Sequence, residues 1–415
     1  MNKKYTLTKY ACYSTNIAMA AVASLSPLLF VTFREMYNIS YTLLGLLVVI
    51  NFSTQLLVDL VFSFFTRFFN IKKTLRIMPV IAVTGFVIYA LMPNFFPESA
   101  YLWICIGTVI FAIASGLTEV LISPVIAAIP SDNPDGEMSK LHSVYAWGVV
   151  FVVIVSTVLL KLIGNHNWMY LALLWALIPL AGVFLFAFCR LPELSISNGA
   201  EGNGGFLNKG LLLCMACIFL GGASECTMGQ WISGFLENAV DIPKLWGDIF
   251  GMALFSVFLG LGRTLYSKYG KNVSVVMLRG MAVACVCYIT ASVIINPFIN
   301  IIACVLTGFC VAMLWPGTLI YMEEQFKGVG VAAYALMAAG GDMGASIAPQ
   351  LVGVVADAVS TSTLAAKLSL TLGISAEQLG MRAGILLSAL FPLMGVLLIL
   401  YMRKYFKKTK NSSGE

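Results

Sequence analysis

Charged residues are scarce in this sequence: they make up 11% of 415 residues, whereas about 25% is usual in soluble domains. Hydrophobic residues make up 60% of the chain. Such a composition excludes a soluble globular protein. The sequence also lacks a polar segment long enough to form a separate soluble domain, which argues against a sensor that carries a soluble output domain.

Histidine is almost absent, with only His142 and His166, and no HxxE or GxSxG motif occurs. These absences argue against a metal site and against a membrane-embedded hydrolase, so we expect neither a metal nor an enzyme. The ten cysteines lie almost entirely in apolar runs and are expected to be small helix residues, the Cys214–Cys217 CxxC included. No repeated filter loop suggests a channel. The first ten residues are too short and polar for a signal peptide, so the first span is expected to be retained.

What the sequence does contain is about twelve long apolar runs. A hydrocarbon core of about 30 Å requires roughly 20 apolar residues per helix, so these runs predict an all-α membrane protein. The predicted spans are 11–33, 41–64, 75–93, 99–128, 139–161, 167–190, 209–236, 244–267, 273–295, 297–321, 328–355 and 380–403.

Most basic residues fall on one side of the membrane. They lie in the N-terminal segment, the 67–76 and 263–279 loops and the 403–410 tail. The opposite side holds only Arg34, Lys161, Lys244, Lys367 and Arg382. The positive-inside rule therefore predicts a multi-pass protein of the plasma (inner) membrane with both termini in the cytoplasm. Because the net charge of +6 follows this topology, nucleic acid is not an expected partner.

A polar linker divides the spans into two sets of six. Residues 191–208, rich in Gly, Asn and Ser, predict a cytoplasmic linker between bundles at 1–190 and 209–415, the second ending in a basic tail. Residues 356–380 predict a short amphipathic surface helix. Gly107 and Gly116 recur as Gly308 and Gly317, and a basic loop follows the second span of each half. Parallel six-helix repeats of this kind are typical of the major facilitator superfamily.

Four carboxylates lie deep in the apolar runs: Asp59, Glu119, Glu225 and Asp342. A charge at such depth costs about 2.5–3.5 kcal/mol or more, so these acids are expected to border a water-filled cavity or a partner. Glu119 precedes Pro124 by five residues, and a proline loosens its helix by removing one backbone hydrogen bond. We therefore interpret Glu119 as a proton carrier, although an acid bonded to a neighbouring helix for packing is the alternative.

Several segments resemble the fucose–proton symporter family within that superfamily. GLTEV…SP followed by MSKLHSVYAWG is similar to its fourth and fifth helices, which typically carry a Glu and a Leu-His motif. NFSTQLLVD is similar to its second helix, and GGASECTMGQWISGFLEN to its seventh. The resemblance implies two pseudo-symmetric six-helix bundles, twelve transmembrane helices, alternating access, and a sugar or similar solute moved with a proton.

The family's first-helix Asp is missing, because the matching stretch ASLSPLLF contains no acid, and this departure puts fucose itself in doubt. Asp59 or Glu225 is a candidate substitute, which leaves three candidates for proton coupling together with Glu119. Aromatic faces stack on sugar rings, while amides and hydroxyls bond to sugar hydroxyls. The candidate substrate-binding residues are Asn51, Gln55, Gln230, Trp231, Trp315 and Tyr145, and the candidate gating or packing residues are Pro124, His142 and Asp342.

The sequence therefore predicts a monomeric, proton-coupled symporter of a small polar solute such as a monosaccharide, embedded in the lipid bilayer. No cofactor is expected, since the proton motive force supplies the energy. A proton-coupled exporter of drugs or metabolites in the same superfamily is the first alternative. A non-transporting membrane sensor or scaffold is the alternative from another class.

Overall fold

The protein is described by a computed structural model that covers residues 3–39, 41–194, 208–240, 242, 247–326 and 329–413. Throughout this part of the chain the regular secondary structure is helical. Eleven segments are long and apolar enough to cross a membrane, and a twelfth long helix, α1, precedes them. The helical content agrees with the apolar runs of the sequence, because in a bilayer a helix satisfies every backbone hydrogen bond internally.

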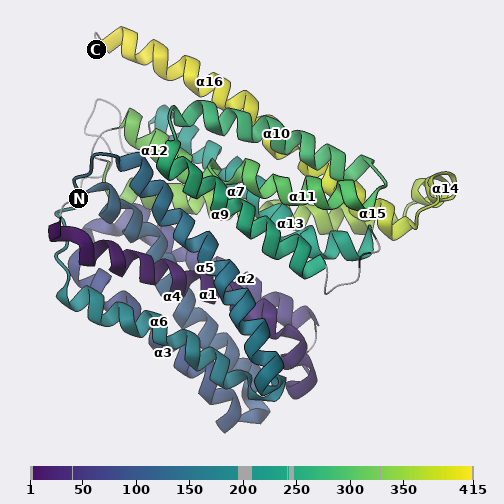
Figure 1. Ribbon diagram of the computed structural model, residues 1–415, viewed down its shortest axis with the longest axis horizontal. Helices are drawn as coiled ribbons and strands as arrows, with labels where there is room; N and C mark the ends of the chain where they lie inside the picture. The colour runs from purple at the N-terminus through teal and green to yellow at the C-terminus, as the bar shows by residue number, and fades with distance from the viewer. Residues whose placement is uncertain are drawn as a thin grey trace. The chain divides into compact units, whose positions relative to one another are not determined.

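The chain forms two compact units (Figure 1). Unit 1 comprises Met1–Glu201 with Gly328–Ala339, and unit 2 comprises Gly202–Lys327 with Gly340–Glu415. Most of the predicted linker, residues 195–207, lies outside the described part of the chain.

Unit 1 contains six long helices joined by short turns. Asn70 and Asn133 cap two of them, each accepting a hydrogen bond from a backbone amide of the first turn. An aromatic cluster forms part of the core, in which the rings of Phe33 and Trp168 lie 4.9 Å apart edge to face. The helices are α1 (Thr6–Tyr37), α2 (Tyr41–Phe65), α3 (Ile71–Phe95), α4 (Ala100–Ala127), α5 (Pro134–Ile163) and α6 (Trp168–Phe188), with single turns η1 (Lys3–Tyr5), η2 (Thr66–Phe68), η3 (Pro97–Ser99) and η4 (Asn165–Asn167).

Unit 2 is also helical but more interrupted. Its eighth span opens with the π-helical η5 before continuing as an α-helix, and a short surface helix, α14, lies in the predicted 356–380 interval. The elements are α7 (Lys209–Asn238), η5 (Gly247–Ala253), α9 (Leu254–Tyr269), α10 (Val273–Val293), α11 (Pro297–Val311), α12 (Leu314–Gln325), α13 (Val331–Ser360, whose residues up to Ala339 belong to unit 1), α14 (Thr363–Leu372), α15 (Ala376–Ser388) and α16 (Leu390–Ser413).

Two of the predicted spans contain a short interruption of the helix, although each remains one candidate membrane span. The tenth breaks between α11 and α12, and the twelfth between α15 and α16. The first break begins at Ala312, four residues before Pro316, and the second is at Ala389, three residues before Pro392. A proline has no amide hydrogen and its ring clashes with the carbonyl four residues earlier, so the helix is interrupted at that carbonyl.

The predicted glycine correspondence does not extend to the contacts that the glycines make. Gly107 of α4 lies against the backbone of Tyr89 in α3, whereas Gly308 of α11 lies against the carbonyl oxygen of Phe255 in α9. The second pair differs in the same way, because Gly116 lies against α2 whereas Gly317 lies against α10. In each unit the fourth span packs tightly on its neighbours, but equivalent glycines meet helices that are not equivalent.

Candidate functional site

One face of α2 carries three polar side chains. Asn51, Gln55 and Asp59 are spaced four residues apart, so successive turns place them on the same side of the helix. Gln55 is buried, and Asp59 is completely so, with 0% of its surface exposed. The exposed residues of α2 include Leu57 and Leu60. The helix thus presents leucines outward and carries its polar stripe on a buried face.

Helix α4 meets this stripe at Gly116. A Cβ atom there would lie 3.2 Å from both the Cα and the carbonyl oxygen of Gln55, so the close crossing of the two helices depends on glycine. Glu119 follows three residues later and therefore projects from the same side of α4. One carboxylate oxygen of Glu119 lies within 4.8 Å of one of Asp59. The structure thus brings together two of the three candidate proton-coupling residues.

This carboxylate pair has a specific chemical capacity. Two like charges at this separation in a poorly solvated environment repel each other strongly. The pair is therefore more stable when one proton is retained between the two groups than when both are ionised. Glu119 is half-buried whereas Asp59 is fully buried, so Glu119 is the more accessible member of the pair.

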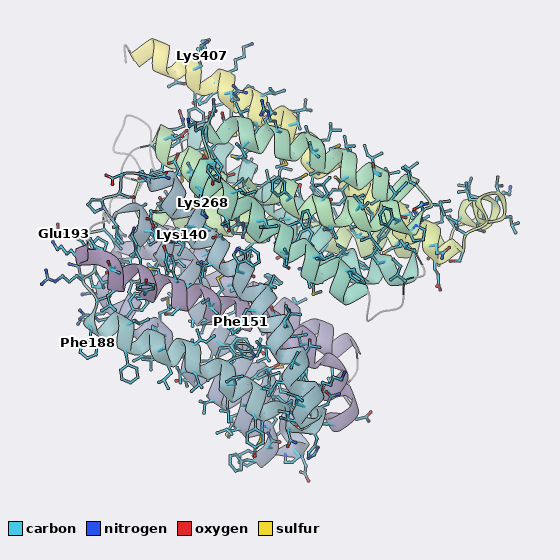
Figure 2. All side chains as sticks on the ribbon, in the orientation of Figure 1. Lys140, Phe151, Phe188, Glu193, Lys268 and Lys407 are labelled. Carbon is cyan, nitrogen blue, oxygen red and sulfur yellow. The ribbon has the colours of Figure 1, made fainter. Side chains whose placement is uncertain are left out.

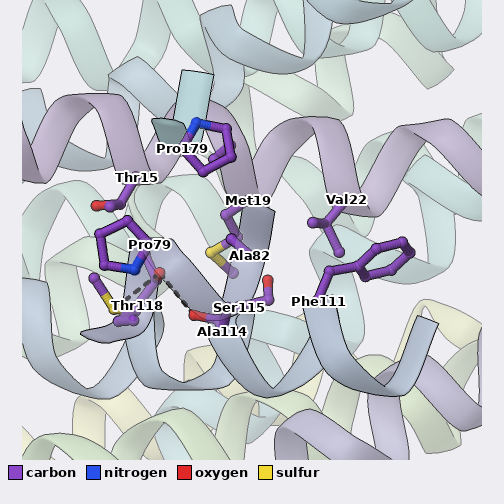
Figure 3. A pocket seen from close by; sticks show the side chains of 12 residues that line it. Thr15, Met19, Val22, Pro79, Ala82, Phe111, Ala114, Ser115, Thr118 and Pro179 are labelled. Atoms are coloured by element: carbon purple, nitrogen blue, oxygen red, sulfur yellow. Dashed lines mark hydrogen bonds between the residues drawn. The ribbon is translucent and has the colours of Figure 1, made fainter. Parts of the chain in front are cut away.

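Another face of α4 is packed against α1 and α3. A cavity of about 10 Å³ lies beside this face, lined by Thr15, Ser115, Thr118 and two prolines, Pro79 and Pro179, among others. Figure 3 shows these side chains around it. The Thr118 hydroxyl donates to the carbonyl oxygen of Ala114, at 2.8 Å. This volume suffices for about one water molecule, so the cavity is a packing gap and not a solute site.

The end of α4 is joined to α5 by side-chain contacts. Ser123, next to Pro124, has its hydroxyl oxygen 3.4 Å from Nε2 of His142. His142 and Tyr145 are both half-buried, one turn apart on α5, and Pro124 is buried. Pro124 does not divide α4, which continues to Ala127. These three residues therefore lie at the α4–α5 contact of unit 1.

In unit 2 the buried acid Glu225 has a basic partner. Both its carboxylate oxygens accept hydrogen bonds from Nη2 of Arg263, at 2.8 and 2.9 Å. The side chains are 13% and 3% exposed, respectively, so the ion pair is buried. The prediction that Arg263 belongs to a cytoplasmic loop is wrong, because Arg263 lies inside α9, six residues before the end of that helix. Its apolar neighbours on both sides were the signal that it is buried.

Arg263 also stabilises the break in the tenth span. Its Nε donates to the carbonyl oxygen of Ala312, at 2.9 Å. In a continuous helix this carbonyl would accept from residue 316, but Pro316 has no amide hydrogen. One guanidinium group thus joins α7, α9 and the α11–α12 junction, and it satisfies both a buried acid and a buried carbonyl.

The two candidate tryptophans of unit 2 pack on α13. The ring of Trp315, half-buried, lies against Gly341 of α13 and is close to Gly222 of α7. Trp231 donates from its indole nitrogen to the carbonyl oxygen of Pro349, at 2.8 Å. Both rings are therefore held in fixed orientations. Gln230, beside Trp231, is exposed.

Asp342 is buried in α13 among small residues. Gly341 and Gly344 on either side of it lie against Trp315 and against the backbone of α7 at Phe219. The small residues therefore allow α13 to approach α7 closely, as the sequence suggested. The described structure thus distributes the candidates between the two units: an acid pair and amides in unit 1, and an ion pair, tryptophans and Asp342 in unit 2.

Comparison with known proteins identifies the family. The sequence model of the Major Facilitator Superfamily matches residues 11–349, well over half of the chain. The search of the curated proteins found no match.

Solved structures agree with the family assignment. The transporter FucP of this superfamily, in an outward conformation, is similar with a TM-score of 0.72 and 13% identity, covering 96% of this chain and 99% of its own. The proton:xylose symporter XylE bound to 6-bromo-6-deoxy-D-glucose is similar with a TM-score of 0.74 and 14% identity, covering 98% of this chain and 97% of its own. A variant of the E. coli fucose:proton symporter is similar with a TM-score of 0.68 and 13% identity, covering 96% of this chain and 99% of its own. At such identities the likeness establishes the fold alone, and it confirms the predicted fold class.

Proposed function

Because the chain belongs to the Major Facilitator Superfamily, whose members are multi-pass membrane transporters, we propose that it is a proton-coupled symporter of a sugar or another small polar solute, working by alternating access. It has no cofactor in this proposal, and the proton motive force drives accumulation. We place it in the plasma (inner) membrane as a monomer, with both termini in the cytoplasm, as the distribution of basic residues indicates.

The observation that carries the proposal is the carboxylate pair of Asp59 and Glu119 within unit 1. The net charge of the pair is −1 when it holds one proton and −2 when it holds none. This change alters the electrostatic energy of the polar faces of α2 and α4. A solute bound beside the pair therefore favours one protonation state over the other. In a transporter such a difference is sufficient to couple solute movement to proton movement.

The candidate side chains of each unit, taken separately, favour a polar, ring-shaped solute. Asn51 and Gln55 extend the acid pair along α2 with amide groups that both donate and accept hydrogen bonds. Trp315 of unit 2 offers a fixed aromatic face of the kind that stacks on sugar rings. The structurally similar proteins include symporters for fucose and xylose with protons, which is consistent with this class of solute.

Uptake into proteoliposomes tests the proposal directly. The purified full-length protein is reconstituted, a pH gradient is imposed, and radiolabelled monosaccharides and other small polar metabolites are tested in turn. We expect accumulation of at least one solute that collapses when the gradient is removed. Glu119→Gln and Asp59→Asn should each abolish accumulation, while exchange at equal concentrations persists, because the neutral variants bind no transported proton.

Glu98→Gln is the matched control, since Glu98 is an exposed acid in η3 and should not affect accumulation. Accumulation by Glu119→Gln equal to that of the wild type would remove the acid pair from the coupling role. Transport that follows a sodium gradient would contradict proton coupling. Efflux of apolar drugs without sugar uptake would favour the exporter, and a protein that moves no compound in either direction would favour a sensor or scaffold.

A further inference from the structure

Together, α15 and α16 are longer than a membrane requires. The twelfth span, Ala376–Thr409, has 34 residues, about 14 more than a 30 Å hydrocarbon core needs. At one end it begins at a capping box formed by Ser375 and Gln378. At the other end are the basic residues, and no acid occurs anywhere in Leu390–Ser413. The excess length therefore carries a cationic helix out of the hydrocarbon.

The outward face of this helix changes from apolar to cationic along a single line. Residues 393, 397, 400, 404 and 407 are four, three, four and three apart, so they form one stripe on the helix. The first three are leucines, 45%, 62% and 48% exposed, as expected beside lipid tails. The next two are Lys404 and Lys407, both exposed, and Figure 2 shows Lys407 on α16. Arg403 and Lys408 flank them.

The inward face fixes the cationic end of α16 against the rest of unit 2. The buried Phe406 ring packs edge to face on Tyr321 and Phe326, with centroids 5.7 and 5.8 Å away. Gly210 makes room for this packing, because a Cβ there would lie 3.0 Å from Phe406. The ammonium of Lys209 lies over Tyr405, 5.4 Å from the ring centroid. The lysines of the outward line are thus displayed by an anchored helix and not by a loose tail.

We propose that the outward face of α16 around Lys404 and Lys407 binds the headgroups of anionic phospholipids. The leucines that precede the lysines on the same line face the acyl chains, so the lysines come next, at the depth of the phosphates. Arg403 and Lys408 lie beside this line and not on it. The two lysines of the line therefore carry the assignment.

Lipid selectivity of the full-length protein tests this surface. The protein is reconstituted into nanodiscs of phosphatidylcholine containing about one-third phosphatidylglycerol, and the lipids retained after mild detergent extraction are quantified by mass spectrometry. We expect several-fold enrichment of phosphatidylglycerol over the bulk mixture, reduced by high salt. Lys404→Gln with Lys407→Gln should remove most of the enrichment, since a lysine at an anionic surface contributes roughly five-fold to binding.

Lys268→Gln with Lys271→Gln is the matched control, because these lysines are also exposed and also follow a membrane span. That pair should retain the enrichment. An equal loss in both double variants would show a general effect of positive charge and overturn the assignment to α16. No enrichment in the wild type, or enrichment displaced by millimolar inorganic phosphate, would also overturn it, the second result indicating a soluble anion.

Discussion

The two units of the molecule treat buried carboxylates in opposite ways. In unit 1, Asp59 and Glu119 lie within 4.8 Å of each other, so that two acids share one site. In unit 2, Glu225 is held by two short hydrogen bonds to Arg263. The first arrangement has a variable charge, since one proton can enter or leave it. The second pairs an acid with a base and is neutral as a whole.

This difference separates a candidate proton-coupling site from a candidate structural ion pair. Burial of an acid is costly in both units, but in unit 2 the cost is offset by a cation that is itself bound to the Ala312 carbonyl. In unit 1 the repulsion between the acids is relieved by a proton, which is the ion that the proposed function moves. Depth in the sequence alone therefore did not distinguish the two kinds of acid.

The largest expected effect is on the ion pair of unit 2. Arg263→Met leaves Glu225 buried without its cation and the Ala312 carbonyl without its donor, so we expect a loss of about 3–5 kcal/mol of stability. The combined variant with Glu225→Gln should recover much of this loss, because no buried charge remains. Thermal unfolding of the purified protein in detergent measures both. A single variant as stable as the wild type would show that the ion pair has no structural role.

The next effect concerns the break between α11 and α12. Pro316→Ala restores an amide that can donate to the Ala312 carbonyl within the helix. In this background Arg263→Met should cost about 1–2 kcal/mol less than in the wild type, because one orphaned acceptor has gained another donor. A double-mutant cycle of unfolding midpoints gives the coupling. Additive losses would mean that the guanidinium does not stabilise the break through that carbonyl.

Sequence reasoning found the fold and the acids but not their partners. The length and polarity of the apolar runs are sufficient to predict membrane helices, because a bilayer imposes a minimum length and excludes charge. Which acids meet depends on where two helices cross. The α2–α4 crossing at Gly116 is not visible in the residues of either helix alone.

Arg263 shows the limit of counting charges. The positive-inside rule treats every arginine near a span as a marker of topology, whereas the burial of this one requires an acid on another helix. Its neighbours, Leu261 and Gly262 before it and Leu265 and Tyr266 after it, continue the apolar run of α9. An arginine within such a run, in a chain that also has an unpartnered acid in the preceding span, is a predictable ion-pair candidate.

A smaller effect is expected when the acid pair of unit 1 is neutralised. Asp59→Asn is nearly isosteric and removes one of two like charges, so its stability should lie within about 1 kcal/mol of the wild type. The contrast with Arg263→Met in the same unfolding assay isolates the difference between the two units. If Asp59→Asn unfolds as readily as Arg263→Met, the Asp59 carboxylate is structural and the comparison fails.

The smallest effects concern the glycines that recur between the units, and they test whether the α2–α4 crossing sets the acid pair. At Gly116 a new methyl group would meet the backbone of Gln55, which cannot turn aside, so α2 must move away from α4 by a few tenths of an ångström. At Gly317 it would meet the Met277 and Val273 side chains, 3.0 Å away, which can adjust.

Because alanine favours a helix over glycine by up to about 1 kcal/mol, Gly317→Ala should leave the stability unchanged or slightly raise it. Gly116→Ala should lower the free energy of unfolding by about 1 kcal/mol. Only Gly116→Ala should also weaken gradient-driven uptake, since it separates Asp59 from Glu119. Equal uptake by the two variants in proteoliposomes would mean that coupling does not depend on the spacing of the acids.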